Sequence, residues 1–209
     1  MAVAFCTEVM RFQSSIGLAC SAPSHKDPAC GVFSSLGGYS ERVNLAVDDV
    51  VVYGMHGIGR VATQEEQALR GATRQVLVLE LADGLTVTLP LGRAREQLRP
   101  LASEADLHRV QEALREDRAL SLDRWLSRRR EMLAKLAGGD PVALAEIVSD
   151  AAQRERTRRA KGTKPHLSSE EREISGKAWK LLSGEIARVR GLQQSEADDW
   201  IDDQLTRTR

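Results

Sequence analysis

The stretch DDVVVYGMHGIGRV, residues 48–61, decides how the first half of this chain is interpreted. A run of three valines and a tyrosine precedes GMHGIG, in which three glycines surround His56. Three interpretations compete: a loop that cradles phosphate, a metal-binding or catalytic histidine, and a tight turn in a small β-barrel. The residues on either side decide between them.

The phosphate loop is excluded by its context. A dinucleotide-binding Gly-x-Gly-x-x-Gly lies between a strand and a helix, because the helix N-terminus then faces the pyrophosphate. Here Gly54, Gly57 and Gly59 are followed by RVAT, which has the composition of a strand. The glycines therefore indicate turn residues that accept positive φ and a close approach of strands.

A catalytic role for His56 would require a positioned partner residue. The other histidines, His25, His108 and His166, occur in unrelated segments that form no recognisable acid or thiol constellation with it. Packing in a turn is the favoured interpretation of His56. An enzyme that uses this histidine ranks last among the candidate functions, and no catalytic residue is predicted.

The charge of the chain is balanced overall but unevenly distributed. Lys plus Arg and Asp plus Glu both number 30. Residues 121–190 carry 16 basic and 10 acidic side chains, whereas residues 191–209 carry two basic and five acidic ones. A concentration of positive charge favours an anionic partner for residues 121–190.

The three cysteines all occur in the first 30 residues, without a Cys-x-x-Cys pair. This pattern predicts neither a disulfide framework nor a zinc site, and a reducing cytoplasm is the simplest compartment. No apolar run approaches the roughly 18 residues that a membrane span needs, so no membrane partner is predicted. No metal or other cofactor is expected.

Residues 1–44 mix Ser, Gly, Pro and Cys without helical or strand periodicity. We expect a disordered N-terminal extension, with a start codon at Met10 as a further possibility. From residue 47 the sequence changes to short β-rich runs: VVVYG, GRVAT, RQVLVLEL and LTVTLP. The ADG at 82–84 is typical of a hairpin turn. Residues 45–100 are therefore predicted to form a strongly bent sheet or small barrel.

Helical signals replace this pattern after Pro100. Capping signatures start helices at Ser103 and Ser168, while Asp140 followed by Pro141 starts another after a Gly-Gly pair. Residues 101–209 are predicted to form an all-α domain of about five helices. The fold class is then α+β, with a small β-barrel first and a helical domain second.

The segment RWLSRRREM places Trp125 three residues before Arg128 and four before Arg129, so these side chains share a helix face. Trp125 is either a core residue with a solvated charged flank or an aromatic wedge beside phosphate-binding arginines. The pattern alone leaves both open. QRERTRRAKGTK, residues 153–164, is typical of a solvated helix end that can add phosphate contacts.

VDDVVVYGMHGIGRV from Val47 resembles the opening motif V-G-D-x-V-V-Y-P-x-H-G-x-G-x-V of the CarD family, bacterial transcription regulators related to the polymerase-binding module of transcription-repair coupling factor. The similarity continues in order through QVLVLEL, GLTVTLP, the W…RR helix, LAKLAGGDPVALAEIV and LSSEER…KLLSGEIA, over roughly residues 47–205. The first motif is moderately specific, and its combination with the helical motifs is highly specific.

The resemblance implies a Tudor-like (SH3-like) domain that docks on the RNA polymerase β subunit and a helical domain that contacts promoter DNA at the upstream edge of the bubble. It implies a minor-groove wedge at Trp125 and phosphate contacts at Arg128, Arg130 and Arg172. The polymerase-facing positions fall at Gln67, Thr88 and Pro90. Two of these, 67 and 88, are often arginine in actinobacterial relatives, and Gly54 replaces a usual proline, which predicts a looser turn.

The leading functional hypothesis is a monomeric, nucleoid-associated cytoplasmic regulator that stabilises the promoter open complex without cofactor or catalysis. Recognition of DNA would depend weakly on sequence. The alternative is a Tudor-like protein–protein adaptor without direct DNA binding, in which Trp125 is buried in the helical core. Exposure of Trp125 to an aqueous quencher distinguishes the two.

Overall fold

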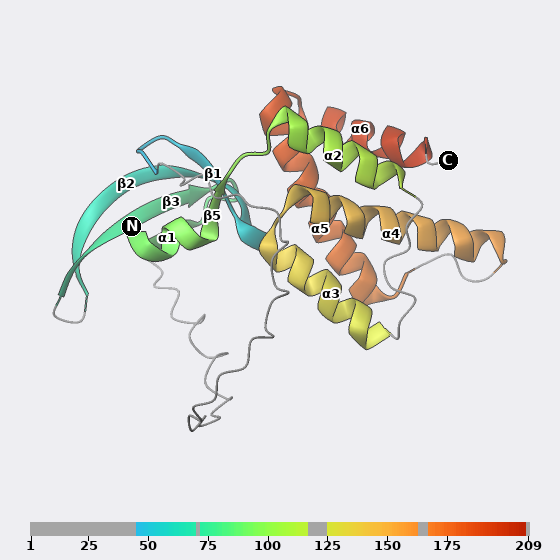
Figure 1. Cartoon of the computed structure of the whole chain (residues 1–209), viewed down its shortest axis with the longest axis horizontal. Helices are drawn as coiled ribbons and strands as arrows, with labels where there is room; N and C mark the ends of the chain where they lie inside the picture. Colours follow the sequence, from blue (N-terminus) through green and yellow to red (C-terminus); the bar gives the residue numbers. More distant parts are fainter. Residues whose placement is uncertain (1–44, 70–71, 117–124, 163–166, 208–209) are drawn as a thin grey trace, which may run out of the picture. The chain divides into compact units, whose positions relative to one another are not determined.

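A computed structural model describes residues 45–69, 72–116, 125–162 and 167–207. The predicted extension, residues 1–44, lies outside the described residues. Nearly all of the predicted β-rich and helical segments lie inside them. The chain is drawn in Figure 1.

The first part is a five-stranded antiparallel sheet in the order β4-β3-β2-β1-β5. Its strands are β1 (Val50–Tyr53), β2 (Gly57–Leu69), β3 (Ala72–Leu81), β4 (Thr86–Pro90) and β5 (Leu98–Pro100). A single 3-10 turn, η2 (Gly54–His56), connects β1 to β2. The tight-turn interpretation of GMHGIG is therefore confirmed.

The sheet is not closed into the predicted barrel. Within the described residues β4 and β5 each pair with one strand only, β4 with β3 and β5 with β1. Helix α1 (Leu91–Gln97) occupies the connection between them and packs on β3, β4 and β5. The long β2–β3 hairpin arches over α1 (Figure 1), so a helix covers the face that barrel closure would otherwise have enclosed.

The core of this part comes from one face of the sheet and from α1. Leu77, Leu79 and Leu81 alternate along β3 and are buried against Ala94 of α1 and Val61 of β2. Alternate residues of a strand point to opposite faces, so this spacing of leucines directs one face of the sheet to the helix. The Tudor-like sheet therefore buries a small core by recruiting one helix.

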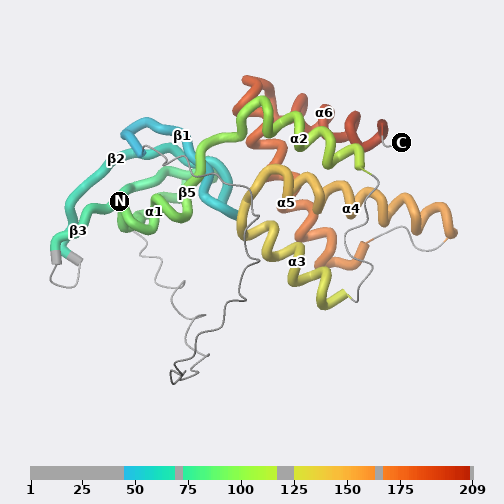
Figure 2. Tube along the Cα trace, viewed as in Figure 1, coloured from blue at the N-terminus to red at the C-terminus, as the bar shows by residue number. Residues whose placement is uncertain are grey.

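Five helices follow among the described residues, in agreement with the sequence prediction. They are α2 (Glu104–Arg115), α3 (Trp125–Gly138), α4 (Pro141–Ala160), α5 (Ser169–Arg190) and α6 (Gln194–Thr206). Capping boxes begin α2 at Ser103 and α5 at Ser168, and Asp140 caps α4 with Pro141 at its first position. The last helix, α6, lies beside α2, the first of the five (Figure 2).

Two glycines bring η2 into backbone contact with the end of α3. Gly54 has φ +40° and Gly139 has φ +64°, and a Cβ added to Gly139 would lie 2.7 Å from the carbonyl oxygen of Gly54. A Cβ on Gly54 would lie 2.9 Å from the carbonyl oxygen of Ala137. Proline fixes φ near −65° and could not adopt the conformation of Gly54. Gly54 is thus a tightly packed residue rather than the looser turn expected from sequence.

Among the described helices, none contains a stretch long and apolar enough for a bilayer span.

Candidate functional site

Trp125, the residue singled out as wedge or core, is the first residue of α3. Its indole is half-buried and packs against the edge of the helical core. The guanidinium carbon of Arg128 lies 5.6 Å from the centroid of the ring. The predicted sharing of one helix face by Trp125 and Arg128 is confirmed. Trp125 is therefore intermediate between the two alternatives, because one side of the ring is covered and the remainder is accessible.

Arg128 is largely buried, with 14% of its side chain exposed. Its Nη2 donates to Oε1 of Glu171 at 3.0 Å. Glu171 belongs to the first turn of α5, so this ion pair crosses from one helix to another. The guanidinium thus lies against both the indole ring and a carboxylate.

Glu171 is more deeply buried than Arg128, with 6% of its side chain exposed. Its Oε2 accepts a hydrogen bond of 2.9 Å from the backbone N–H of Ser168, and the Ser168 hydroxyl accepts one of 3.2 Å from the N–H of Glu171. Arg158 at the end of α4 places its Nη2 3.8 Å from the same oxygen. One carboxylate therefore connects α3, α4 and α5.

The electrostatic environment of this carboxylate favours its ionised form. Burial of Glu171 raises its pKa, but the hydrogen bonds from Ser168 and the positive charges of Arg158 and Arg128 outweigh that effect. The pKa of Glu171 consequently lies below its ordinary value. At neutral pH the group is a carboxylate that attracts both guanidinium groups.

A second ion pair lies beside the first. Arg129 donates from Nε to Glu170, so consecutive arginines of α3 pair with consecutive glutamates of α5. The first turns of α3 and α5 lie at the same end of the helical part, as Figure 1 shows. The two pairs fix the start of α3, which carries Trp125, to the start of α5.

Arg130 and Arg172 differ from Arg128 in being exposed. Arg130 lies on α3, and Arg172 lies in the first turn of α5 immediately after Glu171. Within the part of the chain that the structure describes, neither guanidinium has an ion pair with a carboxylate. The structure thus brings all four predicted DNA-binding residues to the adjoining ends of two helices, with Arg130 and Arg172 accessible.

This arrangement is chemically suited to an anionic, partly apolar ligand. Exposed guanidinium groups bind phosphate, and a half-buried indole provides some apolar surface at the same end of α3. Phosphodiester backbone next to a distorted base step fits these features.

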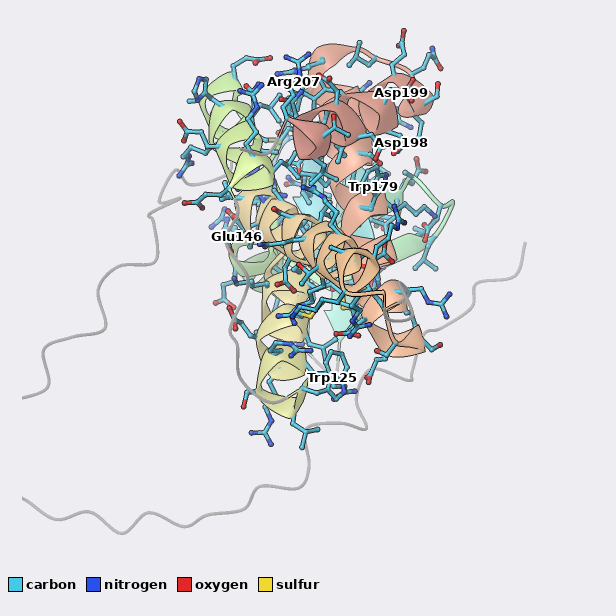
Figure 3. The ribbon with its side chains drawn as sticks, turned by 90° about the vertical axis from the view of Figure 1, so that its right-hand side faces the viewer. Trp125, Glu146, Trp179, Asp198, Asp199 and Arg207 are labelled. Carbon is cyan, nitrogen blue, oxygen red and sulfur yellow. The ribbon has the colours of Figure 1, made fainter. Side chains whose placement is uncertain are left out.

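The other two tryptophans have different surroundings. Trp179 of α5 donates from its indole N–H to Asp198 of α6 at 2.7 Å, and the Arg190 guanidinium lies 4.6 Å from the Trp200 ring centroid. Figure 3 shows Trp125 far from Trp179, Asp198 and Asp199. These contacts hold α5 and α6 together, so they are structural.

The predicted polymerase-facing residues lie on one face of the sheet. Gln67, Thr88 and Pro90 pair in register with Arg74, Val78 and Val76 of β3, respectively. These β3 partners alternate with Leu77, Leu79 and Leu81 of the same strand, so the three residues lie on the sheet face opposite those leucines, where Val76 is also buried. Gln67 and Thr88 are exposed, and Pro90 is half-buried.

His56 has the surroundings of a turn residue. Its ring stacks on Tyr53 with the centroids 4.8 Å apart and the planes at 19°. It is exposed at the end of η2. Among the described residues, no group of three or more His, Cys, Asp and Glu side chains is placed to hold a metal ion.

Two residues have partners that the sequence patterns did not indicate: Glu171, which pairs with Arg128, and Arg99 of β5, which pairs with Glu185 of α5 and so links the sheet to the helices. The capping signature gave Glu171 a local role only. Its position on α5 relative to α3 depends on tertiary packing, for which the sequence contains no local signal.

Comparison with protein families yields two matches. Residues 45–102 match the family model described as CarD-like/TRCF RID domain. Residues 109–202 match the model described as CarD, C-terminal domain. The first match contains the whole sheet with α1, and the second runs from within α2 to within α6.

Proposed function

Because this chain belongs to the CarD family of RNA polymerase-interacting transcription factors, we propose that it binds the polymerase β subunit and stabilises the promoter open complex. The sheet supplies the polymerase contact. The adjoining ends of α3 and α5 contact DNA at the upstream edge of the transcription bubble. Trp125 acts there as a minor-groove wedge.

The observation that carries this proposal is the grouping of Trp125 with Arg128, Arg130 and Arg172. A wedge inserted at a base step needs phosphate contacts nearby, because unstacking costs a few kcal/mol that backbone contacts offset. Arg130 on α3 and Arg172 in the first turn of α5 are exposed, and the indole of Trp125 is half-buried. The balance of charge in residues 121–190, with 16 basic and 10 acidic side chains, favours the same anionic partner.

A site of this size can supply enough binding free energy to favour promoter opening. Opening DNA works against stacking of roughly 1.4 kcal/mol per step. A protein that binds only the opened or distorted form shifts the equilibrium by its difference in affinity for the two forms. A wedge with a few phosphate contacts supplies a few kcal/mol. Attachment to polymerase raises the effective concentration, so weak binding with little sequence preference is sufficient.

On the polymerase side, we propose that Gln67, Thr88 and Pro90 form part of the contact. Their common position on the face opposite the core supports this assignment, since that face is not occupied by α1. Gln67 and Thr88 are uncharged. The contact they make is therefore based on hydrogen bonds and shape rather than on ion pairs.

In this proposal the protein acts as a monomer in the cytoplasm, associated with the nucleoid through polymerase and promoter DNA. It performs no catalytic step and requires no cofactor. His56 contributes to the turn between β1 and β2 by stacking on Tyr53.

Co-purification with RNA polymerase followed by footprinting of a promoter tests this function. We expect the full chain to co-purify with polymerase through the β subunit and to protect the upstream edge of the bubble. Co-purification without any change in the footprint would instead support the adaptor alternative. Absence of co-purification would reject the polymerase contact.

A further inference from the structure

We propose that Glu171 is a positioning residue for Trp125, acting through Arg128. The carboxylate fixes the Arg128 guanidinium, and the guanidinium fixes the orientation of the indole that enters DNA. This inference rests on the proposed function, because it concerns how the wedge is held ready. It assigns a role in promoter opening to a buried acidic side chain.

A continuous series of contacts connects α5 to the indole of Trp125. Glu171 Oε1 lies 3.0 Å from Arg128 Nη2, and the Arg128 guanidinium carbon lies 5.6 Å from the centroid of the Trp125 ring. The exposed fractions of the Glu171 and Arg128 side chains are 6% and 14%. Buried charges are held in one geometry by their partners. The least exposed arginine of the group is thus also the one in contact with the ring.

The two carboxyl oxygens of Glu171 have separate roles. Oε2 accepts the backbone N–H of Ser168 and completes the capping box of α5, whereas Oε1 accepts from Arg128. A capping box requires only an acceptor at this position, and glutamine provides one. The negative charge is needed by Arg128 and by Arg158 rather than by the cap. Glu171→Gln therefore separates the two roles.

The indole depends on this arrangement because the helical core covers only part of it. Trp125 is half-buried at the edge of that core. A cation over an aromatic ring adds directional attraction to ordinary packing. Without the carboxylate, the guanidinium loses the charged partner that holds it beside the ring, and the orientation of the ring is less well fixed. A wedge that must be ordered during binding binds more weakly than one already in place.

Two explanations of the role of Glu171, positioning of the indole and simple charge repulsion of DNA, predict opposite effects of Glu171→Gln. Glu171→Gln removes a negative charge from a region that faces DNA, so charge alone predicts equal or tighter binding to double-stranded DNA. Loss of the wedge orientation predicts a shorter-lived open complex, since the wedge acts only on distorted DNA. Measuring both quantities on one variant separates the explanations.

The experiment uses the full chain with RNA polymerase holoenzyme and a promoter fragment. The half-life of the open complex is measured with wild type, Glu171→Gln, Trp125→Ala and the double variant. We expect Glu171→Gln to reduce the gain in half-life by about two- to fivefold, the effect of a partly exposed cation–π contact. We expect the double variant to equal Trp125→Ala, because the acid acts only through the indole.

Glu170→Gln is the matched control. Glu170 is the neighbouring acid, and it pairs with Arg129 across the same two helices. We expect its open-complex half-life to remain closer to wild type than that of Glu171→Gln. Equal losses in the two variants would mean that any ion pair between α3 and α5 suffices, and would overturn the specific role of Glu171.

Arg128→Gln keeps the inference testable if Glu171→Gln lowers the melting temperature. It removes the guanidinium and leaves the Ser168–Glu171 cap in place. We expect the same loss of half-life, again without further loss in the Trp125→Ala background. If Glu171→Gln or Arg128→Gln shortened the half-life further in the Trp125→Ala background, the positioning role of Glu171 would be rejected. An unchanged half-life in Glu171→Gln would reject it too. Neither result would affect the proposed wedge. An unchanged half-life in Trp125→Ala itself would reject the proposed wedge and the inference with it.

Discussion

Arg99 of β5 and Glu185 of α5 form a bidentate ion pair. Nη1 of Arg99 lies 2.6 Å from Oε1 of Glu185, and Nη2 lies 2.7 Å from Oε2. Arg99 also donates from Nε to the carbonyl oxygen of Gly139 at 3.0 Å, and Glu185 accepts the backbone N–H of Ala102 at 2.9 Å. The Glu185 side chain is 2% exposed. One buried pair therefore connects the sheet to the end of α3 and to α5.

Glu185→Ala is expected to destabilise the chain strongly. Removing one partner of a buried ion pair leaves the other charge uncompensated, at a cost of about 3–5 kcal/mol. Chemical denaturation at neutral pH measures the free energy of unfolding. Arg188→Ala, at an exposed position in the last turn of the same helix, is the control and should change it by less than about 0.5 kcal/mol. A small effect of Glu185→Ala would contradict the structural role of the pair.

Gly139→Ala and Gly138→Ala are expected to have opposite effects on stability. Gly139 has φ +64°, and an added Cβ would meet the Gly54 backbone at 2.7–2.8 Å, so alanine causes both strain and a clash. The strain alone costs roughly 1–2 kcal/mol. Gly138 is helical with open space around the added Cβ, and alanine there is neutral or stabilising by up to about 1 kcal/mol. Melting temperatures of the two variants decide the point, and equal values would contradict the close contact between η2 and α3.

The stability of the chain should depend on pH through Glu171. Because the folded-state pKa of this carboxyl lies below its ordinary value of 4.5, its ionised form stabilises the fold above that pH. This contribution is lost as pH falls below 4.5 and through the folded-state pKa. The difference in unfolding free energy between wild type and Glu171→Gln should therefore shrink across that range. A difference that stays constant from neutral pH to pH 3 would contradict the ion pairing of Glu171.

Arg130→Ala and Arg172→Ala should weaken DNA binding without loss of stability. Both side chains are exposed, so their removal leaves the core intact. Each lost phosphate contact reduces the slope of log affinity against log salt concentration by about 0.9 on duplex DNA. Titrations at several salt concentrations measure the slope. Arg188→Ala again serves as control, and an unchanged slope for both site variants would exclude them from the DNA contact.

Local patterns in the sequence predicted the strands, the hairpin turns and the helix starts, because a capping box or a Gly-containing turn is encoded within a few residues. The sequence offered both a strongly bent sheet and a small barrel, and it did not indicate that the sheet stays open, since α1 arises from seven residues without a distinctive period. The Arg99–Glu185 pair is separated by 86 positions and the Arg128–Glu171 pair by 43. Such pairs result from packing between elements, and residue spacing does not encode them. The grouping of Trp125 with Arg130 and Arg172 followed only from the family resemblance.

The half-life of the promoter open complex with wild type and with Trp125→Ala tests the central claim most directly. We expect Trp125→Ala still to co-purify with RNA polymerase and still to fold, because the indole is half-buried at the edge of the helical core. We also expect this variant to lose most of the gain in half-life that wild type confers. A Trp125→Ala protein that is destabilised by roughly 3–5 kcal/mol, as for a core tryptophan, yet prolongs the open complex as well as wild type would contradict the assignment of Trp125 as a wedge.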